Sequence, residues 1–114
     1  MITLRKLQTL PTKTRRRKSV RLLEWFEREI RRGRSVDGRF LAGLIEQLEQ
    51  DLGNPIIGRE LAGLRSRLTE GTPPEQLFRE INSCRHGVMR TLSLEPADWD
   101  LLEPYSSAIE SSQL

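Results

Sequence analysis

Apolar residues recur along this 114-residue chain with the period of an α-helix, and this periodicity constrains the fold more than any other feature. The clearest stripe has spacings of four, three and four residues, which place its members on one side of a helix. It consists of Ile57, Leu61, Leu64 and Leu68. Comparable stripes lie within residues 20–30, 41–48 and 77–92, and aromatic residues make up only 5% of the chain. Because strands favour aromatic and β-branched residues, we expect an all-α fold, a compact bundle of four main helices with short flanking helices.

Residues that begin or end helices separate the first two stripes. Thr12 is predicted to cap the first main helix, over residues 13–32, and Gly33 to end it. The second helix is predicted to begin at Ser35 or Asp37 and to run to about residue 51, before a Leu-Gly-Asn turn.

The last two main helices have stronger signals at their starts. Asn54 followed by Pro55 is a cap with proline in the first helical position, and this helix is expected to end before Gly71. The sequence Thr72-Pro-Pro-Glu75 matches a capping box, which predicts a fourth helix that runs to about residue 92.

The length of the chain fits one domain with its own core. We expect residues 1–114 to form a single helical domain, with 1–12 as an N-terminal arm or short helix and 103–114 as a polar C-terminal tail. A further short helix is expected near residues 96–102, where Trp99 and its leucine neighbours would pack on one end of the bundle.

Two of the predicted helices share a short pattern. Residues 38–50 and 58–70 match at seven of thirteen positions, and both contain Leu-Ala-Gly-Leu. Two copies are too few for a repeat solenoid. The pattern is either a coincidence between two leucine-rich helices or the sign of a helical hairpin, in which small residues such as Gly43 and Gly63 allow a close approach of the two helices.

Positive charge is concentrated at the start of the chain. Residues 1–34 hold 12 Lys/Arg and three Glu, whereas residues 35–114 hold seven Arg and 13 Asp/Glu. The densest run is KTRRRKSVR, residues 13–21, with six cations and no acid. Such asymmetry indicates an acidic partner, of which nucleic acid is the commonest.

The first cations of this run destabilise the N-terminus of the helix that they begin. A helix dipole disfavours cations in the first turns by about 0.3–1 kcal/mol each, and Arg17 and Arg21 form a like-charge pair four residues apart. Later cations have acids at the favourable spacing, because Glu24 precedes Arg28 by four and Glu27 precedes Arg31 by four. Since no local partner compensates the first cations, we interpret them as a surface for an external anion.

Phosphate is the anion that this surface would suit best. Guanidinium groups bind phosphate through two parallel hydrogen bonds, and contacts to roughly four to six phosphates predict a slope of log affinity against log salt near −4 to −5. Replacing Arg15, Arg16 and Arg17 with Ala is expected to flatten this slope by up to about three units and to leave the fold intact. Trp25 could stack on an exposed base. The predicted nucleic-acid-binding residues are Lys13, Arg15, Arg16, Arg17, Lys18, Arg21, Trp25, Arg28 and Arg32.

The sequence therefore predicts a small nucleic-acid-binding protein, RNA more than DNA, and an accessory subunit of an RNA-acting complex is one form of it. The main alternative is a protein–protein interaction or adaptor module, or a homo-oligomeric helical protein without nucleic acid. An anionic membrane surface is a weaker alternative, because Glu24, Glu27 and Glu29 interrupt the polar side of the first helix. A helix-turn-helix interpretation fails, because it would bury Arg59 between two helices.

No catalytic, metal-binding or cofactor-binding constellation is visible in the sequence, and we expect no enzyme activity and no cofactor. The one cysteine, Cys84, and the one histidine, His86, are too few ligands for a structural zinc site. We expect the cysteine to be buried and the imidazole to be exposed. No apolar run is long enough to span a membrane.

A single cysteine fits a reducing compartment, and we expect a cytoplasmic protein. Residues 1–23 also lack acids, as mitochondrial transit peptides do. The basic segment runs directly into a core-forming helix, which favours the cytoplasmic interpretation.

Overall fold

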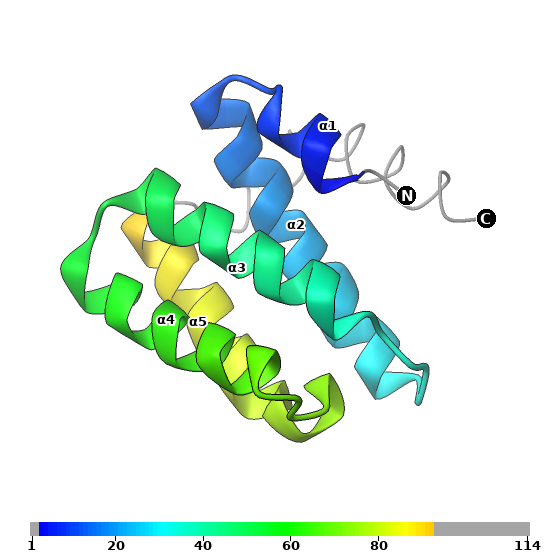
Figure 1. The fold of residues 1–114 in the computed structure, drawn as a ribbon. Helices are drawn as coiled ribbons and strands as arrows, with labels where there is room; N and C mark the ends of the chain where they lie inside the picture. The colour runs from blue at the N-terminus through cyan, green and yellow to red at the C-terminus, as the bar shows by residue number, and fades with distance from the viewer. Residues whose placement is uncertain (1–2, 93–114) are drawn as a thin grey trace.

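Six helical segments follow one another in the computed structural model, which describes residues 3–92 (Figure 1). The elements are α1 Leu4–Gln8, α2 Thr12–Arg31, α3 Gly38–Leu52, α4 Pro55–Thr69, the 3-10 helix η1 Pro74–Leu77, and α5 Phe78–Thr91. No strand occurs in this described part, and the predicted all-α bundle of four main helices is confirmed. The short helix expected near 96–102 and the polar tail at 103–114 lie outside the described residues.

The helices enclose one apolar core, to which every helix contributes. α3 and α4 lie side by side and form the predicted hairpin, while α2 packs against both α3 and α5 (Figure 1). The stripe that predicted α4 is buried in full. The other buried apolar residues are Leu7, Val20, Leu22, Leu23, Phe26, Leu41, Leu44, Ile45, Leu48, Leu77, Ile81, Cys84 and Val88.

Two of the predicted caps are present with the expected geometry. The Asp37 carboxylate accepts hydrogen bonds from the backbone N–H groups of Arg39 and Phe40, at 2.9 and 3.3 Å. The Asn54 side chain accepts from Ile56 N–H at 2.9 Å, with Pro55 in the first helical position. These bonds satisfy backbone donors that have no partner inside the helix, which explains why α3 and α4 begin where the sequence predicts.

Two other predicted caps are wrong. Thr12 is the first residue of α2, and Pro11 takes the cap position without a side-chain hydrogen bond. Thr72 does not open a capping box, because Pro73 would then have to be helical. A residue before proline is held in the extended region, and Pro73, which precedes Pro74, has ψ 136°. The fourth predicted helix therefore starts as the 3-10 helix η1 at Pro74, one residue later than a capping box at Thr72 predicts.

α2 and α5 run antiparallel to each other. The Arg31 guanidinium lies 5.3 Å from the centre of the Phe78 ring, and one turn earlier in α2 the Glu27 side chain bonds Asn82 and Arg85. Along the contact between the two helices, residue numbers in α2 decrease as those in α5 increase. Both helices advance by about 1.5 Å per residue. Leu92 follows Phe78 by fourteen residues, so the end of α5 lies beside the part of α2 near Arg17.

The glycines of the shared Leu-Ala-Gly-Leu pattern have different neighbours. A Cβ atom at Gly43 would collide with Leu4 Cδ1, so this glycine admits α1 to the surface of α3. A Cβ atom at Gly63 would meet no atom within 4 Å apart from its chain neighbours and the backbone of its own helix. The expectation that these glycines bring α3 and α4 together is therefore wrong, although the hairpin itself is present. In the described part of the chain, no helix has the length and apolar character needed to cross a membrane.

Candidate nucleic-acid interface

Arg15 and Arg16 are bound inside the fold, at the C-terminal end of α3. The Nε and Nη2 atoms of Arg15 donate to the Asp51 carboxylate at 2.7 and 2.6 Å, and its Nη1 atom donates to the Leu10 carbonyl at 2.9 Å. Arg16 donates to the backbone carbonyl of Asp51. The Asp51 side chain is only 5% exposed and also accepts a hydrogen bond from Gln47 at 3.2 Å.

This contact gives the first cations of α2 a role that their own helix does not provide. The last turn of α3 contains no basic residue, and its final carbonyls and the negative end of its dipole need positive partners. Arg15 and Arg16 supply them from α2. The hydrogen bond to Asp51 raises the pKa of Arg15 above its ordinary value, although burial acts in the opposite direction.

The expectation that nothing in the fold compensates the basic run is thus wrong for Arg15 and Arg16. Alanine at Arg15 would leave the buried Asp51 carboxylate without its charged partner, which is destabilising. We therefore expect the replacement of all three arginines at 15–17 to destabilise the fold. A binding experiment on a variant of Arg15 or Arg16 needs a check that the variant is folded.

The middle of the predicted track is engaged in packing along α2. Arg21 lies 3.5 Å from Glu24, and its side chain is only 10% exposed. Trp25 is partly buried against the core and meets Phe26 edge-on, with ring centres 5.1 Å apart. Arg28 is partly buried as well. These positions favour structural roles over contact with a large external ligand.

The far end of α2 is open to solvent. The Arg32 side chain is 61% exposed and lies 3.8 Å from Glu29, which also accepts hydrogen bonds from Arg34. The predicted Glu27–Arg31 pair does not form. Glu27 is instead buried against α5, where its carboxylate accepts hydrogen bonds from Asn82 and Arg85.

A second group of cations lies on α1 and the first two turns of α2. Lys13 is exposed, Arg17 and Lys18 are partly buried, and none of the ion pairs within residues 3–92 involves Lys13 or Arg17. The structure adds Arg5 and Lys6, which are exposed on α1; three residues separate the end of α1 from the start of α2. We call the five residues Arg5, Lys6, Lys13, Arg17 and Lys18 the basic end.

Sequence reasoning missed Arg5 and Lys6, although a signal was present. Leu4 and Leu7 have helical spacing and both face inward, since Leu7 is buried in the core and Leu4 packs against it. The two cations between them fall on the other side of a single helical turn. Exposed cations are therefore present on α1 as well as in the run at residues 13–21.

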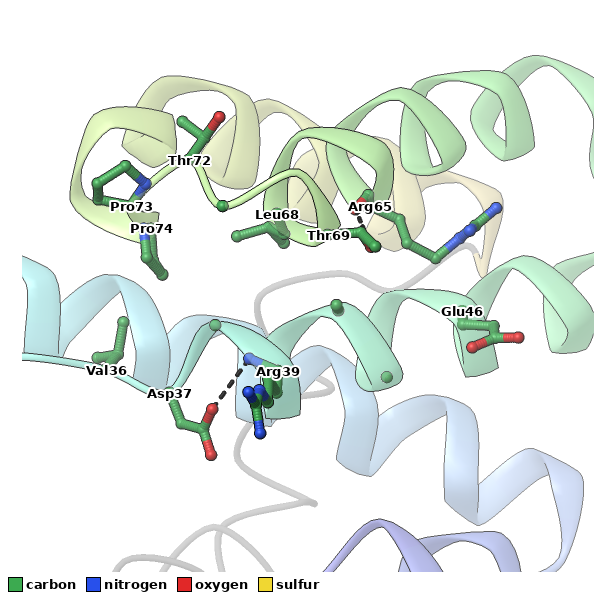
Figure 2. A pocket seen from close by; sticks show the side chains of 14 residues that line it. Val36, Asp37, Arg39, Glu46, Arg65, Leu68, Thr69, Thr72, Pro73 and Pro74 are labelled. Carbon is green, nitrogen blue, oxygen red and sulfur yellow. Dashed lines mark hydrogen bonds between the residues drawn. The ribbon is translucent and has the colours of Figure 1, made fainter.

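A groove lies on another face of the bundle, between the first turns of α3 and the turn that follows α4 (Figure 2). Its volume is about 1,060 Å³. Apolar side chains such as Val36, Leu68 and Pro74 line it, and Arg65 and Glu46 lie toward one end. Within residues 3–92 no cluster of three His, Cys, Asp or Glu side chains could hold a metal ion. Charged and hydroxyl side chains such as Asp37, Arg39 and Thr72 also line the groove, so its surface is mixed.

Cys84 is buried in α5 and His86 is exposed, as the sequence predicts. Burial raises the pKa of the Cys84 thiol from an ordinary value of 9.0 to about 11. A raised pKa keeps the thiol protonated, so near neutral pH the reactive thiolate is scarce.

We expect Cys84 to react slowly with a thiol reagent in the native protein. Two pKa units make the thiolate about 100-fold rarer than in the unfolded chain at about pH 8, and burial slows the reaction further. The measurement is the rate of release of the coloured product from Ellman's reagent, in buffer and in concentrated guanidinium chloride. Equal rates in the two conditions would contradict a buried thiol.

Comparisons of the chain with protein-family models, with curated proteins and with solved structures find no match.

Proposed function

We propose that this protein binds nucleic acid, RNA in preference to DNA, through phosphate contacts of the basic end. One observation carries the proposal. Lys13 and Arg17 stand four residues apart in the first two turns of α2, where the helix dipole and their mutual repulsion both disfavour them. Asp51, which pairs with their neighbour Arg15, forms no ion pair with Lys13 or Arg17.

The overall charge supports an anionic ligand. All 19 Lys/Arg of the chain and 11 of its Asp/Glu lie in residues 1–92, a net charge of +8 for that part. A polyanion that meets the basic end approaches a molecule whose field attracts it from a distance, which speeds association.

Binding of this kind requires little geometric precision. Each Lys or Arg that neutralises a phosphate releases condensed counterions, and the gain in entropy drives binding without base-specific contacts. Phosphate contacts fix position, whereas base contacts specify sequence. We therefore expect an affinity that depends strongly on salt and weakly on sequence.

Binding titrations at several salt concentrations test this function. Fluorescence anisotropy would follow labelled duplex RNA, single-stranded RNA and duplex DNA of matched sequence, between about 50 and 200 mM salt. If the basic end contacts about four phosphates of the duplex, the slope of log affinity against log salt is about −3 to −4. An absence of binding at the lowest salt would contradict the proposal.

A second candidate function is recognition of a protein partner, and the groove beside α3 favours it. A lining of apolar, charged and hydroxyl side chains suits the side chains of a peptide or a loop. The same titrations separate the two candidates, because a folded protein without affinity for any nucleic acid would leave the partner interpretation as the better one.

A further inference from the structure

The residues after α5 carry the charge opposite to that of the preceding part. Residues 93–114 contain five Asp/Glu and no Lys or Arg. Their acids alternate with apolar residues, since Asp98 and Asp100 flank Trp99 and two leucines follow. We call residues 93–114 the acidic segment. Its composition is complementary to a cationic helix face with an apolar margin.

The last described residue before the acidic segment, Leu92, lies near such a face. α5 runs antiparallel to α2, and its end at Leu92 lies beside the part of α2 near Arg17. Trp25 of α2 and Leu92 of α5 are both partly buried and pack against the core. A chain of 22 residues can extend about 70 Å, more than the roughly 30 Å length of α2.

We propose that the acidic segment docks on the N-terminal half of α2, with its carboxylates toward the basic end. A tether of this length holds the carboxylates at an effective concentration in the millimolar range, so weak ion pairs suffice. Docking would then compete with phosphates for the same cations. The competition rests on the proposed function, whereas the docking itself does not.

Carbodiimide cross-linking of the 114-residue chain tests the docking without nucleic acid. The reagent activates a carboxylate, the lysine Nζ attacks it to form an amide, and the activating group leaves as a urea. The three lysines of the chain are Lys6, Lys13 and Lys18, all in the basic end. At low salt we expect amides that join Lys13 or Lys18 to Asp98, Asp100 or Glu95, identified by mass spectrometry of peptides.

A mixture of isotopically heavy and light protein shows whether the amides form within one chain. Lysine amides only to acids of residues 3–92, or tail amides only between heavy and light chains, would overturn the docking. The second result would assign the acidic segment to a neighbouring copy.

The competition has a separate test in the full chain with a matched control. One variant neutralises four of the five acids of the acidic segment, E95Q/D98N/D100N/E103Q, and the control neutralises four exposed acids of the bundle, E46Q/E60Q/E70Q/E75Q. Both raise the net charge equally. We expect the first to increase the affinity for duplex RNA about tenfold more than the control at low salt, because only it frees the basic end. Equal increases would overturn the competition.

The two tests fail in different ways. Tail amides in a protein that binds no nucleic acid would keep the docking and contradict the proposed function. Salt-dependent binding without tail amides would keep the proposed function and overturn the docking.

Discussion

Replacing Glu27 with alanine is expected to lower the free energy of unfolding by about 3–5 kcal/mol. The Glu27 side chain is 2% exposed, and its carboxylate accepts a hydrogen bond from Asn82 Nδ2 at 2.6 Å and pairs with the Arg85 guanidinium. Alanine would leave a largely buried guanidinium without a counter-charge and an amide without its acceptor. Urea denaturation followed by circular dichroism measures the change.

Glu24 provides the matched control for this prediction. It lies one turn earlier in α2, is 33% exposed, and is 3.5 Å from Arg21. Because solvent screens such a pair, Glu24→Ala is expected to cost about 0–1 kcal/mol. Equal costs for the two substitutions would show that Glu27 does not link α2 to α5.

Removing three cations of the basic end is expected to weaken RNA binding by about 100-fold near 0.1 M salt. The variant is Lys6→Ala/Lys13→Ala/Arg17→Ala, and none of these residues takes part in an ion pair within residues 3–92. Each lost phosphate contact removes about 0.9 unit of slope in the salt dependence, so the slope should also flatten by up to about three units. Anisotropy titrations at several salt concentrations give both quantities.

The control for this variant has the same change in charge on other helices. Arg39→Ala/Arg67→Ala/Arg79→Ala removes three exposed cations from the start of α3, the end of α4 and the start of α5, at the end of the bundle away from the basic end. Because charges distant from the ligand are screened beyond roughly 10 Å, we expect a loss of about threefold or less. Equal losses would mean that net charge, and not the basic end, determines the affinity.

Local signals predicted the secondary structure well. The caps at Asp37 and Asn54 and the apolar stripe of α4 depend on residues a few positions apart, and the structure has all three. The capping box at Thr72 failed because the constraint of one proline on the next outweighed the capping pattern.

The partners of the charged residues were not predictable in the same way. Arg15 and Asp51 are separated by 36 residues, and Glu27 and Arg85 by 58, so these contacts depend on how helices pack. The position of Glu27 in the apolar stripe indicated a buried carboxylate, although its spacing to Arg31 suggested a local ion pair. Glu27 stands four residues after Leu23 and three before Ile30, at a core position of the α2 stripe, where a carboxylate needs a buried partner.

The cations of the basic run were predicted to form one surface, whereas the fold divides them into two groups. Arg15 and Arg16 complete the end of α3, and their neighbours Lys13 and Arg17 remain outside the ion pairs of residues 3–92. The positions of cations along the sequence do not show which of them will contact another helix, because those contacts depend on how α2 and α3 cross.

The slope of log affinity against log salt for Arg15→Ala and Arg17→Ala tests this division most directly. Both variants lose one cation of the same run, and circular dichroism would establish that each is folded. We predict that Arg17→Ala flattens the slope by about 0.9 unit and that Arg15→Ala leaves it unchanged. An equal flattening by Arg15→Ala would contradict the account, because it would place Arg15 on the ligand and not on Asp51.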